Sequence, residues 1–499
     1  MRSSGVLMHI SSLPSPYGIG TMGKAAVQFV DFLEEAGQTY WQILPVCPTS
    51  YGDSPYQSFS SFAGNPYFID LDYLCLDGLL KKEECEAYNW GGDETQVDYG
   101  ILYENRYDLL KKAFARFKAD EPEDFKTFCE EEAEWLDNYA LFMALKDANH
   151  GAAWFTWDRD LKFRKAEALE KVKEDKKEDI AFWKMLQYLF YKQWRELKDY
   201  ANVRGIKIIG DVPIYVAGDS ADVWANPEQF YLNEDLEMID VAGCPPDAFS
   251  ATGQLWGNPL YRWDYHRNTG YQWWISRMSY CFRLYDVVRI DHFRGFDEYF
   301  SIPYGDKDAR GGHWEKGPGI DLFRKIEQAL GWKQVIAEDL GYMTDSVRHL
   351  VYESGFPGMK VLEFAFDSRD SGCASDYLPH NYPENCVAYT GTHDNETIVG
   401  WWKSITVAER KLARDYLCDH ATPEEELYKC FISLIMRSAA RVCVIPMQDY
   451  MGLDNRFRMN KPSTVGMNWK WRIKKRDLTK KLQKEIYDVT LRYGRKNWD

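Results

Sequence analysis

The chain has 499 residues, of which 45% are hydrophobic, and its formal net charge is −16. This length is sufficient for a large apolar core and for a barrel with insertions that forms one catalytic unit. The acidic balance argues against a nucleic-acid partner, because phosphate backbones repel a negative surface. No run of about 18 apolar residues is present, so the sequence predicts no membrane span.

The N-terminal segment and the cysteines indicate a cytoplasmic protein. Residues 1–5 contain one basic residue and no apolar stretch of the kind that a signal peptide needs. The 11 cysteines include no CxxC pair, which is typical of reduced thiols rather than of a disulfide framework or a zinc site. Phosphate-binding glycine motifs and closely spaced histidine pairs are also absent, so we expect no cofactor and no metal. The oligomeric state is left open.

Segments with the pattern of strands alternate with segments that have the pattern of helices. Apolar side chains recur at helical spacing over residues 26–33, 182–197, 321–330 and 344–354. The segments expected to form strands are 6–10, 40–44, 206–211, 287–290, 334–337, 360–365, 386–390 and 442–446. Eight strands that alternate with helices predict an α/β fold, a (β/α)8 TIM barrel. Residues 72–180 interrupt the alternation and predict an inserted, mainly helical subdomain.

Helix ends carry expected signals. Gly37, Gly205, Gly331 and Gly355 each follow a helical segment, where a left-handed residue commonly ends a helix. Thr344 is placed to cap the helix over 344–354.

Three strand-like segments end in an acid, at Asp291, Glu338 and Asp394. The carboxyl ends of barrel strands meet at one face, where such enzymes place their chemistry. Three carboxylates there can supply a nucleophile, a proton donor and a charge stabiliser for glycosidic bonds. Arg289 lies two residues before Asp291 and is expected to lower its pKa, although a purely structural ion pair has the same geometry.

The choice of the proton donor and the roles of the nearby histidines leave alternatives open. Glu338 is favoured over Asp339 as proton donor, because Glu reaches further and starts with a higher pKa. His292 and His393 are expected to bond sugar hydroxyls, and stabilisation of a turn is the alternative. The loop 253–259 and the segment 51–57 combine aromatic and amide side chains in a way that favours ligand binding.

The combined motifs resemble the 4-α-glucanotransferases called amylomaltases or disproportionating enzymes, family 77 of the glycoside hydrolases in the α-amylase clan. The segments that carry this resemblance are 52–57, 210–216, 253–261, 289–295, 337–341 and 392–395. The match extends from Leu13 to Arg472, nearly the whole chain. One departure is Ser463, which stands where relatives commonly carry glycine and which changes the local backbone freedom.

The resemblance implies a role for each candidate residue. Asp291 is expected to be the nucleophile, Glu338 the acid/base and Asp394 the stabiliser of the transition state. Contacts with substrate are expected from Arg289, His393, Asp211, Tyr56, Asp247, Phe249, Gln254, Trp256, His292, Asn460 and Tyr51. Residues 241–275 are expected to form an active-site flap on a single catalytic unit that spans residues 1–499.

The implied activity is transfer of α-1,4-glucan segments, with maltooligosaccharides and α-glucans as partners. The retaining mechanism needs the two catalytic carboxyl groups about 5–5.5 Å apart. An α-glucan hydrolase on the same scaffold is one alternative, since it uses the same carboxylates. A non-catalytic glucan-binding protein is another, although a binder has no need of an acid with a raised pKa.

Overall fold

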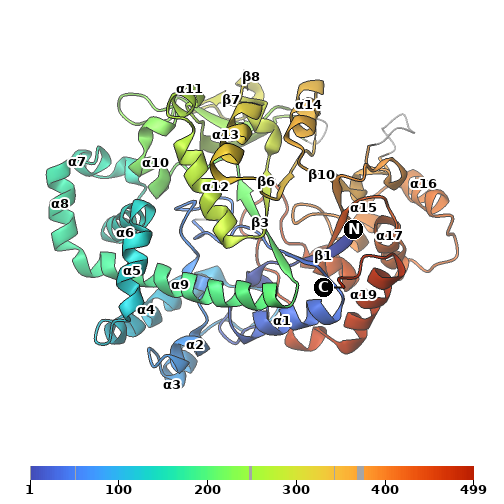
Figure 1. Cartoon of the computed structure of the whole chain (residues 1–499), viewed down its shortest axis with the longest axis horizontal. Helices are drawn as coiled ribbons and strands as arrows, with labels where there is room; N and C mark the ends of the chain where they lie inside the picture. The colour runs from blue at the N-terminus through green and yellow to red at the C-terminus, as the bar shows by residue number, and fades with distance from the viewer. Residues whose placement is uncertain (1, 51, 247–249, 342, 368–375, 499) are drawn as a thin grey trace.

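The computed structural model describes the chain except for residues 1, 51, 247–249, 342, 368–375 and 499. At its centre is a closed barrel of parallel strands (Figure 1). The strands, in order around the barrel, are β1 (Ser3–Leu7), β2 (Tyr40–Gln42), β3 (Lys207–Pro213), β6 (Val287–Asp291), β9 (Val335–Ala337), β10 (Gly358–Val361), β11 (Cys386–Tyr389) and β12 (Val442–Pro446). Because β12 also pairs with β1, the ring closes, and the predicted (β/α)8 barrel is confirmed.

Two strands lie closer to the N-terminus than their apolar runs predict. β1 ends at Leu7, and the rest of the expected strand 6–10 leads into a 3-10 turn, η1 (Ile10–Ser12). Similarly, β10 ends at Val361 and is followed by η7 (Leu362–Phe364) instead of continuing to residue 365. An apolar run cannot locate such an end, because a buried turn also needs apolar side chains.

The four predicted helices are present, and they end at or next to the glycines that signal their ends. The predicted helices correspond to α1 (Lys24–Glu35), α9 (Lys177–Val203), α13 (Ile320–Leu330) and α14 (Asp345–Ser354). The hydroxyl of Thr344 accepts a hydrogen bond from Val347 N–H, and Gly355 ends α14 with a φ of 70°. Further helices around the barrel are α12 (Gln272–Leu284), α15 (Ile398–Ser404), α16 (Val407–Leu417), α17 (Leu427–Met436), α18 (Met447–Tyr450) and α19 (Lys480–Arg492).

Helices fill the long connection between β2 and β3, on the left of Figure 1. They are α2 (Leu71–Leu76), α3 (Lys82–Glu86), α4 (Tyr99–Phe117), α5 (Glu123–Glu131), α6 (Ala133–Ala148), α7 (Arg159–Lys162) and α8 (Ala166–Asp175). Their buried side chains, such as Leu109 and Leu141, belong to the same apolar core as Val6 of the barrel. Whether residues 72–180 form a separate subdomain stays a prediction.

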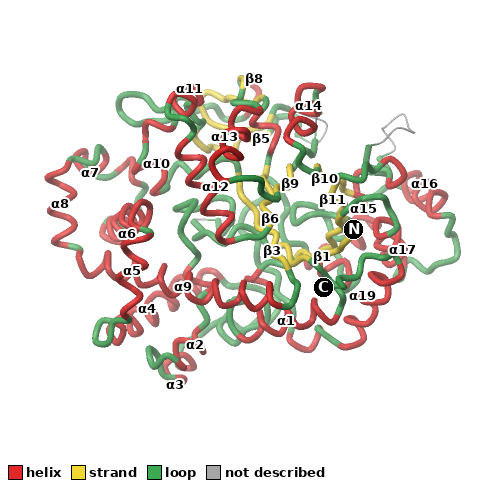
Figure 2. Tube along the Cα trace, viewed as in Figure 1, coloured by secondary structure: helices red, strands yellow, loops and turns green. Residues whose placement is uncertain are grey.

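A second, antiparallel sheet stands beside the barrel and is seen in yellow at the top of Figure 2. Its strands, in spatial order, are β5 (Gln254–Pro259), β4 (Asp240–Cys244), β7 (Glu298–Pro303) and β8 (His313–Lys316). The sequence pattern did not predict this sheet. The expectation of a loop over 253–259 was wrong, because residues 254–259 form β5. β4 and β7 are mostly buried and were also missed, whereas all four residues of β8 are exposed. The short helix α10 (Ala221–Ala225) lies between β3 and β4 in the chain, and the short helix α11 (Trp263–Asn268) follows β5.

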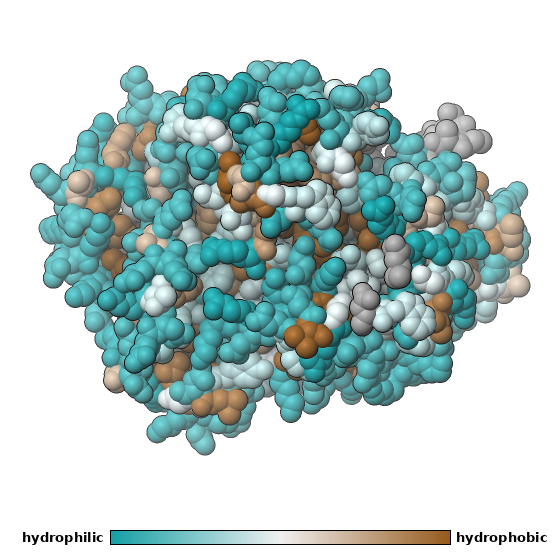
Figure 3. Space-filling model, viewed as in Figure 1, coloured by the Kyte–Doolittle hydropathy of each residue, from teal (hydrophilic) through white to brown (hydrophobic). Residues whose placement is uncertain are grey.

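On the face shown in Figure 3, hydrophilic residues predominate and apolar ones form small scattered groups. None of the helices in the described part of the chain is long and apolar enough to cross a membrane.

Candidate active site

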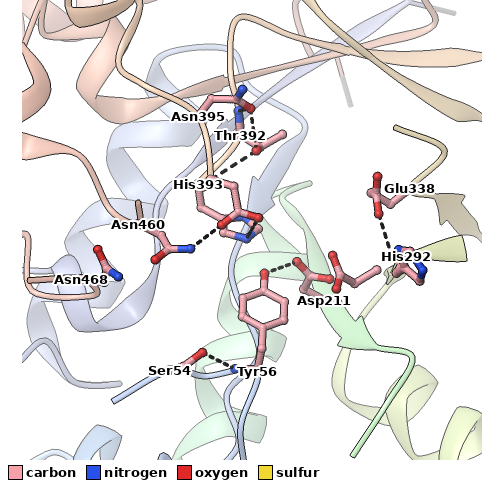
Figure 4. A network of polar contacts seen from close by, with 12 residues as sticks. Ser54, Tyr56, Asp211, His292, Glu338, Thr392, His393, Asn395, Asn460 and Asn468 are labelled. Carbon is pink, nitrogen blue, oxygen red and sulfur yellow. Dashed lines mark hydrogen bonds and ion pairs between the residues drawn. The ribbon is translucent and has the colours of Figure 1, made fainter. Parts of the chain in front are cut away.

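The strand register brings the candidate residues together at the carboxyl ends of the barrel strands. In β3 and β6, Asp211 lies opposite Arg289 and Pro213 lies opposite Asp291. Glu338 directly follows β9, the next strand in the barrel. Figure 4 shows Tyr56 and Asn460 approaching from one side and Glu338 from the other.

A buried arginine links two of the carboxylates. Arg289 Nη1 donates to both carboxylate oxygens of Asp211, at 2.8 and 2.7 Å. The same nitrogen lies 3.0 Å from Asp291 Oδ1. Asp211 Oδ2 also accepts a hydrogen bond of 2.8 Å from the hydroxyl of Tyr56. Asp211 therefore holds Arg289 in place, and Arg289 holds one oxygen of Asp291.

The net pKa of Asp291 differs from the expectation. Arg289 lowers it, as expected, but burial and the nearby charge of Asp211 raise it more, and the pKa of Asp291 is about 6. Burial disfavours the charged form of a carboxyl group more strongly than one cation favours it here. The expectation of a lowered pKa was therefore wrong for the net value, although Asp291 is still largely ionised at neutral pH.

Glu338 is held by two backbone donors. Its Oε2 accepts a hydrogen bond of 2.7 Å from His292 N–H, and its Oε1 accepts one of 2.9 Å from Leu340 N–H. His292 adopts a left-handed conformation with a φ of 52°, which directs its N–H to Glu338. Burial and the charge of Asp291 raise the pKa of Glu338 to about 7, so this group keeps its proton to higher pH than Asp291 does.

The neighbouring acid Asp339 has a structural environment. Its Oδ1 accepts a hydrogen bond of 2.7 Å from Met359 N–H. Its carboxylate also occupies the space where a Cβ on Gly358 would lie, at distances of 2.3–2.8 Å. Asp339 is thus bound to the start of β10, and the geometry favours Glu338 for chemistry.

Asp394 forms a third carboxylate centre with two polar partners. Its Oδ2 lies 3.3 Å from His393 Nε2, and its Oδ1 accepts a hydrogen bond of 2.6 Å from Asn460 Nδ2. Burial by itself raises the pKa of Asp394, but His393 and Asn460 outweigh burial and hold the pKa well below its usual range. For His393 the two effects have the opposite sign. Burial lowers the pKa of His393, but the charge of Asp394 raises it more, so the net pKa is raised. Asp394 is thus ionised at any working pH.

Stacked rings connect the two halves of the site. The rings of Tyr56 and His393 are stacked with centroids 5.1 Å apart. Trp469 contacts both rings, at 5.8 Å from Tyr56 and 6.0 Å from His393. Trp469 itself has a φ of 66°, a conformation that a tryptophan adopts only where its surroundings hold it. These contacts fix the ring of Tyr56 and thereby its hydrogen bond to Asp211.

Residues of the expected flap reach the opposite edge of the site. The Trp256 ring meets the His292 ring edge-to-face at 4.8 Å, and Trp256 Nε1 donates to Gln254 Oε1 at 3.1 Å. Burial lowers the pKa of His292 to about 3, so its ring is neutral. Three further expected contacts, from Tyr51, Asp247 and Phe249, lie outside the described residues.

One residue that the sequence motifs did not single out holds both ends of the loop that carries His393 and Asp394. Asp449 of α18 accepts hydrogen bonds from the Thr390 hydroxyl at 2.5 Å and from Ile398 N–H at 2.8 Å. The signal was weak, because Asp449 lies within α18 after β12, whereas Asp291 is the last residue of its strand. Within the described part of the chain, no group of three or more His, Cys, Asp or Glu side chains is arranged to hold a metal ion.

Comparison with known proteins identifies the family. A profile described as 4-alpha-glucanotransferase matches residues 8–479. The chain belongs to the 4-alpha-glucanotransferase family. The family and enzyme class expected from the motifs are thereby confirmed.

Relatives of known name support this membership over the full length. A 4-alpha-glucanotransferase of Clostridium butyricum is 51% identical over 490 residues, which cover 98% of this chain and all of the relative. One from Thermus thermophilus is 48% identical over 481 residues, 95% of each chain. The solved amylomaltase of Streptococcus agalactiae, in complex with acarbose, is 44% identical, covers both chains completely and superposes with a TM-score of 0.97.

Proposed function

We propose that Asp291 and Glu338 carry out a retaining double displacement that transfers α-1,4-glucan segments to the 4-hydroxyl of an acceptor. The observation that supports this assignment is the difference between the two carboxyl groups. Arg289 contacts Asp291 at 3.0 Å, whereas Glu338 accepts hydrogen bonds from two neutral backbone N–H groups. Burial raises the pKa of both groups, to about 6 for Asp291, where Arg289 opposes it, and to about 7 for Glu338, where the charge of Asp291 adds to it. In the reactive form Asp291 is ionised and Glu338 is protonated.

The first step breaks the glycosidic bond of the donor. Asp291 attacks the anomeric carbon and forms a covalent glycosyl–enzyme while Glu338 gives its proton to the leaving oxygen. The loss of negative charge at Asp291 removes one cause of the raised pKa of Glu338. Glu338 is then a stronger acid and stays ionised after it has lost its proton.

The second step transfers the sugar. Ionised Glu338 takes the proton from the 4-hydroxyl of the acceptor, whose oxygen attacks the anomeric carbon and releases Asp291. Asp394, held ionised by His393 and Asn460, is placed to accept hydrogen bonds from hydroxyls of the reacting sugar. Its fixed negative charge also stabilises the positive charge that develops on the sugar ring.

The remaining residues position this machinery and the glucan. Asp211 and Tyr56 orient Arg289, and we assign Trp256, Gln254 and His292 to the walls of the substrate groove. Tyr51, Asp247 and Phe249 keep their expected substrate contacts as proposals. The complex of the Streptococcus agalactiae relative with acarbose supports an α-glucan at this site. A cytoplasmic location is part of this proposal and is supported by the cysteine pattern.

The test is incubation of the purified protein with maltotriose, followed by chromatography of the products. We expect glucose and a ladder of longer maltooligosaccharides with little gain in total reducing ends. A rising number of reducing ends with accumulating glucose and maltose indicates an α-glucan hydrolase instead. The Asp291→Asn variant is expected to show no turnover, and substantial activity of that variant contradicts the assignment of the nucleophile.

A further inference from the structure

A cavity of about 300 Å³ lies apart from the catalytic carboxylates, none of which lines it. Side chains from α5, α6, α10 and α12 line it, together with Ser60 and Phe62 from the segment after β2. The volume is at the lower end of the range of about 300–1,000 Å³ that is typical of small-molecule sites. None of the residues assigned to the reaction lines this cavity.

Aromatic rings form one wall of the cavity. Phe62 and Trp135 are stacked with centroids 6.4 Å apart, and Tyr280 meets them at 5.3 and 5.7 Å. Trp273 stands perpendicular to Phe62 at 6.4 Å. Phe62, Trp135 and Trp273 remain partly exposed although they belong to this cluster. Such exposed aromatic faces fit the C–H face of a pyranose ring, and their polar edges fit its hydroxyls.

Polar groups without protein partners stand beside this wall. Asn138 uses its Oδ1 to accept from Arg164, and this leaves its amide donors without a partner in the described part of the chain. Conversely, Asn226 uses its Nδ2 to donate to the Asp222 backbone carbonyl, and its Oδ1 is left to accept. The hydroxyls of Ser276 and Ser279 also line the cavity and have no side-chain partner among the described residues.

The charges at the cavity favour a neutral ligand. Arg283 donates to both carboxylate oxygens of Glu132, at 2.7 and 3.0 Å, and its charge is therefore already paired. Glu131 and Glu134 add negative charge at the same cavity. An anionic or phosphorylated ligand is repelled by these acids, and a purely apolar ligand leaves the amides and hydroxyls unpaired. A polyhydroxylated, uncharged molecule satisfies both conditions.

We propose that this cavity is a second carbohydrate site, which binds a short stretch of an α-1,4-glucan away from the reacting bond. The identity of the sugar rests on the proposed function, whereas the aromatic and polar lining does not. Ser60 and Phe62 continue the segment that carries Tyr56, which connects the cavity with the active site along the chain. A long glucan bound here raises the local concentration of its other segments, an advantage that a trisaccharide does not have.

The experiment is calorimetric titration of the inactive Asp291→Asn protein with maltotriose. Two further variants in that background remove the site in different ways: Trp273→Ala deletes an aromatic face, and Ser279→Trp fills the cavity. We expect each to bind one maltotriose fewer per chain than Asp291→Asn alone. The matched control is Trp332→Ala, a tryptophan that is 71% exposed and does not line the cavity, and it is expected to keep the full number.

A kinetic comparison completes the test. In the active protein, Ser279→Trp is expected to raise KM for amylose about three- to tenfold and to leave KM for maltotriose unchanged. Unchanged stoichiometry in both cavity variants, together with an unchanged KM for amylose, overturns the proposal. Absence of transfer from maltotriose by the wild type contradicts the proposed function instead, and the loss of one bound sugar in the cavity variants still identifies the site.

Discussion

Replacing Glu338 by glutamine removes the proposed proton donor but keeps the size of the side chain. Burial and the charge of Asp291 raise the pKa of Glu338 from 4.5 to about 7. At pH 7 about half of the molecules then carry this proton, against roughly 1 in 300 for an unperturbed glutamic acid. The environment thus increases the fraction of molecules with a protonated Glu338 roughly 150-fold at neutral pH. In the glutamine variant no molecule carries this proton.

We expect the turnover of maltotriose by Glu338→Gln to fall by roughly 10²–10⁴ and the alkaline limb of its pH profile to disappear. An α-maltosyl fluoride donor restores the first step, because fluoride leaves without a proton. The glycosyl–enzyme then accumulates, since glutamine cannot activate the acceptor, and intact-protein mass spectrometry detects it. Asp339→Asn is the matched control, because asparagine can still accept from Met359 N–H, and it is expected to keep most of the activity. Turnover of Glu338→Gln within tenfold of the wild type refutes the assignment.

The same substitution changes how stability depends on pH. Because the pKa of Glu338 is higher in the folded state than in the unfolded state, the folded state binds more protons between pH 4.5 and about 7. The contribution of Glu338 to the free energy of unfolding therefore falls as the pH rises through this window, by at most about 3 kcal/mol. Denaturant unfolding at pH 5 and pH 8 measures it. We expect the free energy of unfolding of Glu338→Gln, relative to that of the wild type, to be higher at pH 8 than at pH 5. For Glu327→Gln, on the exposed side of α13, we expect the same relative value at both pH values.

Three further substitutions test the surroundings of the site. Asn460→Ala removes the 2.6 Å hydrogen bond to Asp394, and we expect kcat/KM for maltotriose to fall roughly 10–100-fold, as measured by initial rates; a change below twofold contradicts the role of Asn460. Asp449→Ala leaves the Thr390 hydroxyl and Ile398 N–H without their acceptor. We expect the free energy of unfolding, measured with denaturant, to fall by about 2–4 kcal/mol. Asp449→Asn is expected to lose less, because asparagine keeps one acceptor oxygen. Ser463 has a φ of 63°, which strains any residue other than glycine. Ser463→Gly removes this strain but gives the unfolded chain more backbone entropy, and we expect the free energy of unfolding to rise by up to about 1 kcal/mol. A lower Tm contradicts this expectation.

The local patterns of the chain were sufficient for the barrel. Alternating apolar runs and helical stripes located the strands and the helices around them, and the signals at Thr344 and Gly355 located the ends of α14. In the small antiparallel sheet, β4 and β7 are mostly buried but were not predicted, and β5 was expected to be a loop. β8 is exposed along its whole length. A strand without a buried face has no hydrophobic period for a sequence pattern to detect.

The structure brings the selected residues together, but their contacts could not be predicted from the sequence. Asp291, Glu338 and Asp394 were selected because each ends or follows an apolar segment, whereas Asp449 lies within α18 and was not selected. The pKa of Asp291 could not be predicted, because burial opposes Arg289 and only the folded protein shows which effect is larger.

The sequence by itself determined the fold class, the placement of Asp291 and Glu338 at strand ends and the membership of the family, because these depend on periodicity and on short motifs. Only the tertiary structure decided which groups meet. The hydrogen bonds from Tyr56 to Asp211 and from Asn460 to Asp394 join residues far apart in the chain. Closure of the barrel brings such residues within hydrogen-bonding distance, and the resulting burial and charge set their protonation.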